Sequence, residues 1–318
     1  MSYRIFDAHC DTLTTLGNGE NLYDAPRCFN FKQLEKYDCF TQVLAIWVDI
    51  AADRNCMDEK VQKYINRFYE ELEKNPGVVH IKTKKDLEDS QKGINVILGI
   101  EGGEAIGTDI ANVEKLYNKG VRLVTLTWNN PYVISDTNCI TVPNLNGEAD
   151  YKGGLTHFGK DVVREMNRLG MVIDVSHLSD KGFYDLLEVS SKPFIASHSN
   201  SRTLCPHARN LTDDMFKELV KKGGVTGINF YHGFIDLQKN EVDATDLIRH
   251  IEHFMSLGGE KNVGIGTDYD GIDYPPKGFA NAGFLGNLYE EMLKLNYSED
   301  LVRDIMSRNM ERVFCECL

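Results

Sequence analysis

The feature that most constrains this chain is an alternation, repeated eight times, of a short β-branched or apolar run with a longer amphipathic segment. Such alternation is typical of parallel sheets whose strands are connected by helices. Eight strand–helix units within about 270 residues suit a closed barrel, so we predict an α/β fold, a (β/α)8 barrel of the TIM type. The strand-like runs lie at 3–9, 39–48, 94–101, 121–128, 171–177, 193–199, 224–231 and 262–268.

An open, doubly wound sheet is the main alternative architecture. It would normally need fewer strand–helix units, and the first turn after a strand here lacks the GxGxxG loop that binds dinucleotide phosphates. The sequence has no Pro/Ser-rich linker and no short tandem repeat, so we expect a single barrel domain over residues 1–318. The turn-rich segments 12–38 and 130–160 are expected to form surface loops or pocket walls.

Charge and composition exclude several classes of protein. The chain has 35 Lys and Arg against 48 Asp and Glu, a net charge of −13, which disfavours binding to nucleic acid. No stretch approaches the roughly 20 apolar residues that cross a bilayer, and the first residues lack the pattern of a signal peptide. We therefore expect a cytoplasmic protein without a membrane partner, whose eight scattered cysteines are free thiols.

Five of the predicted strands end in side chains that can bind a metal ion. In a parallel barrel the C-terminal ends of all strands meet at one rim. Each such residue taken alone is more often structural, because a lone histidine usually makes a hydrogen bond and DYDG is a turn sequence. Five independent coincidences at one rim favour a common site instead. Its candidate members are His9, Asp11, Glu101, His177, His198 and Asp268.

These three imidazoles and three carboxylates, with no thiolate cluster, suit Zn²⁺, with Mn²⁺ or Co²⁺ as substitutes. The set exceeds the three protein ligands typical of one catalytic zinc ion. It therefore predicts two ions, bridged by a carboxylate and by a hydroxide that acts as the nucleophile. A carboxylate not fully committed to the ions would serve as general base and then as acid, and Asp268 is the candidate for this catalytic role.

Several stretches of the sequence resemble one known family. The longest is GLTHFGKDVVREMNRLGMVIDVSHLSD at 154–180, and DAHCDT, GIEGG, PFIASHSNSR, PHARNLTDD, INFY and VGIGTDYDG extend the similarity over nearly the whole chain. They resemble the renal (membrane) dipeptidases, zinc peptidases of family M19 with an amidohydrolase-like barrel. The resemblance implies that Asp268 transfers the proton and that Glu101 bridges the two metal ions. It implies the same five metal ligands: His9, Asp11, Glu101, His177 and His198.

The resemblance also implies substrate-binding residues that spacing alone does not reveal. Arg209 would bind the terminal carboxylate of the substrate, with Asn210 beside it, and Tyr231 would lie in the pocket. A guanidinium group can hold a carboxylate through two parallel hydrogen bonds. Trp128 departs from the family, whose best-known members have at this position a histidine that approaches the substrate carbonyl. Because tryptophan offers only one N–H, either a neighbouring asparagine takes that role or the substrate sits differently.

The sequence thus predicts a zinc-dependent dipeptidase acting on small L-L dipeptides, with L-D dipeptides and a homodimeric state left open. A second hypothesis keeps the metals and changes the substrate, to a lactonase, deaminase or other amidohydrolase acting on a small non-peptide carbonyl compound. A third is a catalytically silent metal-binding protein. It predicts a replaced catalytic residue, and the sequence shows none at the positions above.

Overall fold

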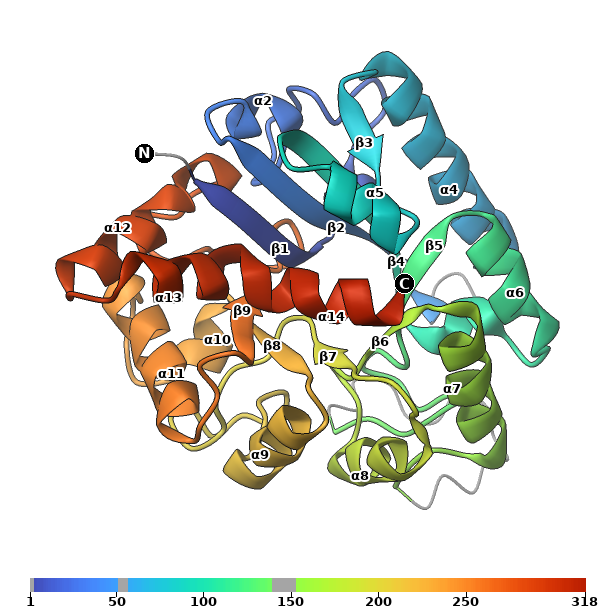
Figure 1. Ribbon diagram of the computed structural model, residues 1–318. Helices are drawn as coiled ribbons and strands as arrows, with labels where there is room; N and C mark the ends of the chain where they lie inside the picture. The colour runs from blue at the N-terminus through green and yellow to red at the C-terminus, as the bar shows by residue number, and fades with distance from the viewer. Residues whose placement is uncertain (1–2, 51–56, 139–152) are drawn as a thin grey trace.

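Eight parallel strands close into a barrel, with helices around the outside (Figure 1). The computed structural model describes residues 3–50, 57–138 and 153–318. Around the barrel the strands follow the order β1-β2-β4-β5-β6-β7-β8-β9, and β9 pairs with β1 to close it. The predicted TIM-type barrel is confirmed. The strands are β1 (Arg4–Cys10), β2 (Cys39–Trp47), β3 (Val78–His80), β4 (Gly93–Glu101), β5 (Val121–Thr125), β6 (Val172–Asp174), β7 (Ile195–Ala196), β8 (Val225–Ile228) and β9 (Val263–Ile265).

Helices follow most of the strands and cover them on the outside. Several begin at a side chain that caps the first turn, as at Thr156, Ser179 and Thr212, each of which accepts a hydrogen bond from a backbone N–H three residues later. The helices are α1 (Thr12–Thr15), α2 (Phe31–Leu34), α4 (Met57–Lys74), α5 (Lys84–Asp89), α6 (Ala111–Asn118), α7 (His157–Leu169), α8 (Asp180–Val189), α9 (Asp213–Lys221), α10 (His232–Ile235), α11 (Ala244–Ser256), α12 (Gly286–Lys294), α13 (Glu299–Arg303) and α14 (Asn309–Cys317), with 3₁₀ turns η2 (Gly103–Ile106) and η3 (Ala282–Phe284) and a π-helical turn η4 (Asp304–Arg308).

The strands differ from the prediction mainly in length. All eight predicted strands are present, and a ninth, β3, pairs with the first half of β4 outside the barrel order. β7 covers only Ile195–Ala196 of the predicted run 193–199. It stops because the backbone N–H of Ser197 donates to the Asp174 carboxylate, as does that of Ser176 beyond β6. A buried side chain thus ends two neighbouring strands.

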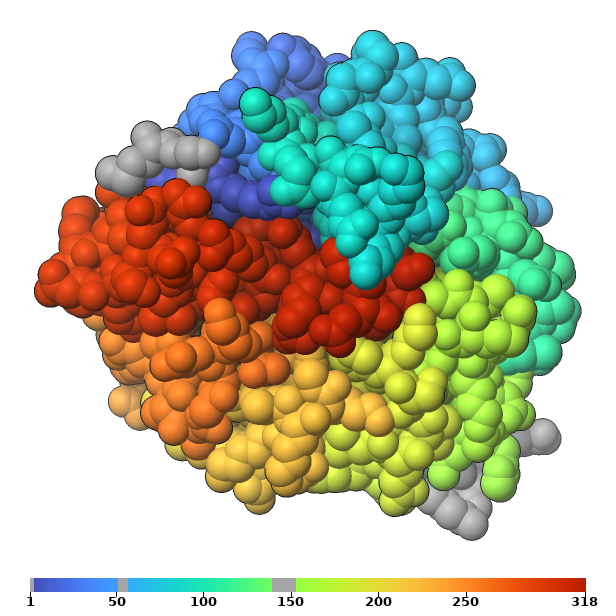
Figure 2. Space-filling view, viewed as in Figure 1, coloured from blue at the N-terminus to red at the C-terminus, as the bar shows by residue number. Residues whose placement is uncertain are grey.

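The N-terminal end of the barrel is filled by apolar side chains. Inward-facing residues from seven strands pack there against the C-terminal helix α14, which lies across the barrel in Figure 1 and closes this face in the space-filling view of Figure 2. The rings of Phe6 and Phe314 have centroids 5.0 Å apart. Arg312 of α14 donates to the carbonyl of Gly223, just before β8, which fixes the helix at this end. The cluster includes Phe6, Val43, Ile97, Leu123, Val172, Ile195, Val225, Met310, Val313 and Phe314.

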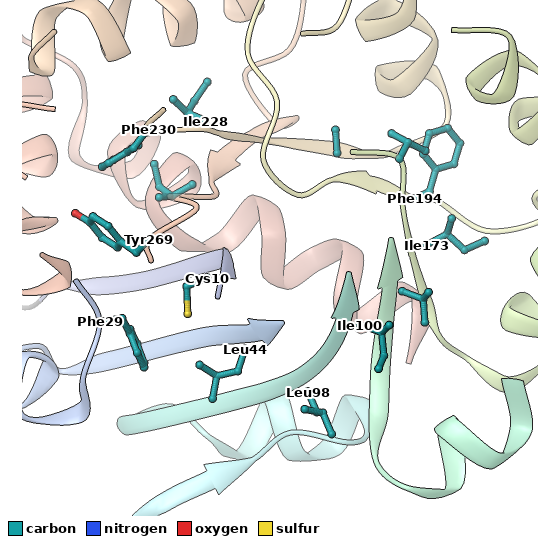
Figure 3. Close-up of a cluster of buried hydrophobic side chains, with 14 of the residues drawn as sticks. Cys10, Phe29, Leu44, Leu98, Ile100, Ile173, Phe194, Ile228, Phe230 and Tyr269 are labelled. Carbon is teal, nitrogen blue, oxygen red and sulfur yellow. The ribbon is translucent and has the colours of Figure 1, made fainter. Parts of the chain in front are cut away.

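The second apolar layer lies between the strands and the surrounding helices (Figure 3). It takes the alternate residues, such as Leu44 on β2 and Leu98 on β4. On β1 the pairing register shifts between Asp7 and Cys10. Phe6 faces the interior and Cys10 joins the outer layer, so the bulge leaves His9 directed to the interior.

Two further expectations concern the surface and the cysteines. Within the described parts of the chain, no helix is both long and apolar enough to cross a bilayer. Six cysteines are free thiols in the structure, namely Cys10, Cys28, Cys39, Cys205, Cys315 and Cys317. Cys56 and Cys139 lie outside the described residues.

Candidate metal centre and substrate cavity

The C-terminal ends of the strands bring together all six metal-binding and catalytic candidates. His9 lies in β1, Asp11 follows that strand directly, and Glu101 is the last residue of β4. The other three lie just beyond β6, β7 and β9, in loops rather than in the strands themselves. All six are buried. The three in loops are His177, His198 and Asp268.

Glu101 lies between two groups of possible ligands. His9 Nε2 is 3.4 Å from Asp11 Oδ2 and 3.6 Å from Glu101 Oε2. On the other side, Glu101 Oε1 is 3.0 Å from His177 Nε2 and 3.5 Å from His198 Nε2. Ligand atoms about 2.0–2.1 Å from one tetrahedral ion are roughly 3.3 Å apart. The distances in both groups match that spacing, and each group can hold an ion with Glu101 shared between them.

The electrostatics of this cluster fit bound cations. Neither ring nitrogen of His9 has a hydrogen-bond partner in the described chain, although the ring is fully buried. Burial disfavours a charged His9 ring, but the Glu101 and Asp11 carboxylates outweigh that effect and raise its pKa well above the usual value. Burial, with help from the Arg209 charge, lowers the pKa of His177 to about 4. A metal ion in place of the proton on His9 would stabilise these buried carboxylates and leave the imidazoles neutral.

Hydrogen bonds at the far side of two rings orient them toward Glu101. His177 Nδ1 lies 2.7 Å from Asn129 Oδ1, which can only accept, so we assign the proton to Nδ1 and the lone pair to Nε2. His198 Nδ1 lies 2.6 Å from Ser197 Oγ, and that hydroxyl donates to Asp174 Oδ2 at 2.6 Å. Supports of this kind set the tautomer and direction of metal-binding histidines.

Asp174 is close enough to His9 and His198 to form a third potential metal group, but its oxygens are already used. Oδ2 accepts from Ser197 Oγ and Thr125 Oγ1, both at 2.6 Å, and Oδ1 accepts from two backbone N–H groups. Asp174 therefore supports the neighbouring loop and ring. Its contacts thus serve both the fold of the loop and the orientation of His198.

The backbone is strained at the site. Among the described residues other than glycine, only four have a positive φ, and His177 (70°), Asp268 (63°) and Asp270 (65°) are three of them. Each such conformation costs about 1–3 kcal/mol and persists only where the surroundings enforce it. Gly271 allows the close packing here, since a Cβ on it would lie 2.2 Å from Asp11 Oδ2 and 2.6 Å from Asp268 Oδ1.

Asp268 lies at the edge of the cluster. Its Oδ2 accepts from Asn229 Nδ2 at 2.9 Å, and its Oδ1 is 3.9 Å from His9 Nε2. Burial, together with the Asp11 and Glu101 charges, raises the pKa of Asp268 to about 7, against the opposing effect of His9. A bound cation would act in the opposite direction.

A cavity of about 370 Å³ opens above this centre. Asp11, Glu101, His177 and Asp268 form part of its lining. Three of the predicted substrate-binding residues also line it, namely Arg209, Tyr231 and Trp128.

Arg209 and Asn210 are neighbours in the chain with different surroundings. The Arg209 guanidinium is buried within the cavity wall, with Nη1 3.4 Å from Ser199 Oγ and its charge over the Phe234 ring. The Asn210 amide instead donates to the carbonyls of Cys205 and Phe234, both at 2.9 Å. Asn210 is absent from the described lining and holds the loop beneath it.

Several residues of the site were not predicted from the sequence. The sequence suggested an asparagine beside Trp128 only as a substitute for the missing histidine, whereas the Asn129 oxygen orients His177. Ser197 and Trp47 were not singled out. For Trp47 there was a signal, because this large aromatic residue lies near the end of the predicted strand 39–48, where the other strands carry polar groups. Nothing in the sequence identifies the partner of Ser197.

The chain is similar to known proteins of one family. The model of the family described as membrane dipeptidase, peptidase family M19, matches residues 1–317. A protein named as an uncharacterized dipeptidase of Schizosaccharomyces pombe is 36% identical over 225 residues, which are 70% of this chain and 52% of that protein. The chain thus matches only about half the length of this relative.

Solved structures give the same result. The dipeptidase AC, described as a metallo peptidase of family M19, superposes with a TM-score of 0.88 at 25% identity, over 100% of this chain and 99% of that one. A metallo peptidase from Rhodobacter sphaeroides, liganded with a phosphinate mimic of L-Ala-D-Ala, gives a TM-score of 0.87 at 25% identity over 100% of both chains.

Proposed function

Since the chain belongs to the membrane dipeptidase family, peptidase family M19, we propose that it is a metal-dependent dipeptidase. The observation that carries the proposal is the position of Glu101, whose two oxygens face two separate groups of ligands. We propose two Zn²⁺ ions as cofactors, and Mn²⁺ or Co²⁺ would suit the same donors. The proposed ligands are His9, Asp11, Glu101, His177 and His198.

When bound, such ions polarise a carbonyl group and lower the pKa of a water molecule, which is the chemistry that peptide hydrolysis needs at neutral pH. Asp268 is proposed to transfer the proton, first as the general base and then as the general acid. Asn229 already donates to Oδ2, so Oδ1 is the atom that accepts the proton and passes it to the leaving amine.

Arg209 is proposed to bind the C-terminal carboxylate of the dipeptide. A buried guanidinium group in a cavity wall recognises a carboxylate strongly, because both partners are charged and desolvated. Tyr231 lines the cavity in the loop after β8, next to the loop that carries Arg209. The Rhodobacter metallo peptidase holds a mimic of an L-D dipeptide, which supports the inclusion of L-D dipeptides in the proposed substrate class.

The test is the release of free amino acids from L-L and L-D dipeptides, with and without added Zn²⁺. We expect zinc-dependent cleavage of the free dipeptides and little cleavage of the same peptides with an amidated C-terminus. Failure to cleave any dipeptide, in protein shown to hold two ions per chain, would contradict the proposal. It would favour a non-peptide carbonyl substrate, for which Trp128 would be the responsible departure.

The carboxylate contact is tested by Arg209→Ala. Loss of a hydrogen-bonded charge pair of about 1.5–3 kcal/mol predicts a decrease in kcat/KM of roughly 10- to 100-fold for free dipeptides. The control is Arg168→Ala, because Arg168 is exposed and pairs with Glu165 on α7. Equal activities of the two variants would show that no free carboxylate is bound by Arg209.

A further inference from the structure

Two tryptophans lie across the mouth of the barrel from the arginine. In a closed ring of eight strands, β2 lies opposite β7, and β4 lies opposite β8. Trp47 ends β2 and Trp128 follows β5, on either side of β4. Arg209 lies in the loop after β7, and Phe234 in the segment after β8. All four side chains line the same cavity, so they form two facing walls.

Trp47 stands at the level of the metal centre. In the parallel pairing of β2 with β4 its partner is Glu101, and paired residues of parallel strands point to the same side of the sheet. The Trp47 ring packs against that of Trp128, with centroids 4.9 Å apart and planes at 60°. The Trp128 ring is in turn 6.1 Å from that of His177. The two indoles therefore form a continuous aromatic surface beside the proposed metal ligands.

The contribution of Trp47 to this wall is the face of its ring. Its Nε1 is buried and has no hydrogen-bond partner in the described chain. A buried indole N–H without an acceptor is unfavourable, so hydrogen bonding does not account for the choice of tryptophan at this position. A large flat surface against a cavity accounts for it, because such a surface binds apolar groups.

We propose that Trp47, with Trp128, binds the side chain of the N-terminal residue of the substrate and favours apolar side chains at that position. The inference rests on the proposed function. With the C-terminal carboxylate at Arg209 and the peptide carbonyl beside Glu101 and His177, the N-terminal residue extends past the centre toward β2 and β5. Trp47 is then a specificity-determining residue.

If Trp47 only packs against its neighbours, its loss should affect all substrates equally. Two series of dipeptides can therefore separate a packing role from a role in specificity. One series varies the N-terminal residue, from Gly-Ala to Leu-Ala and Phe-Ala, and the other varies the C-terminal residue, from Ala-Gly to Ala-Leu and Ala-Phe. We expect Trp47→Ala to lower kcat/KM for Leu-Ala and Phe-Ala about tenfold or more relative to Gly-Ala. The relative kcat/KM values in the C-terminal series should not change in Trp47→Ala. The Trp47→Phe variant should retain most of the wild-type preference in the N-terminal series.

Phe234→Ala is the matched control from the opposite wall. Because Phe234 packs under the Arg209 charge, its loss should lower kcat/KM by the same factor for the dipeptides of both series. A uniform loss in Trp47→Ala as well would overturn the proposal and leave Trp47 as a packing residue.

A second readout does not depend on turnover. The sequence contains only two tryptophans, so intrinsic tryptophan fluorescence reports on this wall alone. We expect Leu-Ala to shift the emission of the Asp268→Asn variant at lower concentration than Gly-Ala does. If this shift is observed but the wild-type protein cleaves no dipeptide, the result would support binding by the two tryptophans and contradict the proposed function. If dipeptides are cleaved but neither the emission shift nor the selectivity for the N-terminal side chain is observed, the proposed role of Trp47 is wrong and the proposed function stands.

Discussion

The two ends of the barrel are built from the same strands and differ in almost every other respect. On β2 the inward side chain is Val43 in the middle of the strand, where it joins the cluster under α14, and Trp47 at the C-terminal end; on β4 Ile97 and Glu101 correspond to them. The first end is apolar and closed by α14. The second buries carboxylates and imidazoles over strained backbone. Stability is therefore expected to depend on the first end and chemistry on the second.

Glu101→Gln tests this separation with the largest expected effect. A glutamine cannot bridge two cations as a carboxylate does, so we expect loss of bound metal and a fall in kcat/KM of roughly 10³-fold or more, equivalent to several kcal/mol. Metal content and kcat/KM measure the effect. Retained metal and activity in Glu101→Gln would contradict the assignment of the chemistry to the second end.

Phe314→Ala tests the other end. Phe314 is fully buried between α14 and the barrel interior, and removing such a ring costs about 3–5 kcal/mol. We expect that loss in the free energy of unfolding, with two ions still bound by the folded protein. The control is Phe284→Ala, since Phe284 is 45% exposed and its loss should change stability by about 0.5 kcal/mol or less. Loss of metal from folded Phe314→Ala would contradict the comparison.

The two ends also differ in how far the sequence predicts them. Alternation and strand ends were enough to predict the barrel, and to gather six polar residues at one rim. Strand lengths were not predictable, because β7 ends where Ser197 bonds to Asp174, a contact between residues 23 positions apart in the chain. The same contact network determines which ring nitrogen of His198 faces the centre. Side-chain partners of this kind leave no periodic signal in a sequence.

Asn210 illustrates the same limit. Its place beside Arg209 suggested a contact with substrate, yet neighbouring residues of a loop need not face the same way. Here the amide donates to the carbonyl of Cys205 in the same loop and to that of Phe234 in α10. β3 was missed for a related reason, since VVH is too short to show a period of two.

Ser197→Ala sharpens the comparison within the polar end. It removes the hydroxyl between Asp174 and His198 and leaves both backbone segments in place. Loss of such a support typically weakens metal affinity by about 10- to 100-fold, or roughly 1.4–2.7 kcal/mol. Competition with a chelator measures the affinity. Ser191→Ala is the control, because the Ser191 hydroxyl bonds to Asn167 before β7. Equal metal affinities in the two variants would show that the Ser197 hydroxyl does not support His198.

The smallest expected effect concerns pH and His250, on α11 beneath the loops of the polar end. Its Nδ1 accepts from the backbone N–H of Ser201 and its Nε2 donates to the carbonyl of Ile235. Burial, with the nearby charges of Arg249 and His253, lowers the pKa of His250 to about 4, although the bond to Ile235 opposes the shift. The unfolded chain keeps a pKa near 6.5. Between these values only the unfolded state gains the proton, so stability falls as pH decreases from about 6.5 toward 4.

The expected slope for His250 is at most about 1.4 kcal/mol per pH unit, and it disappears in His250→Asn. Urea unfolding of the metal-free proteins at several pH values between 4.5 and 7 measures it. His80, whose pKa burial also lowers to about 4, contributes equally to both proteins and cancels in the difference. Phe314→Ala leaves His250 and His80 in place, so it should show the wild-type slope. Identical slopes in wild type and His250→Asn would mean that the loops which carry Arg209 and Phe234 do not depend on a neutral His250.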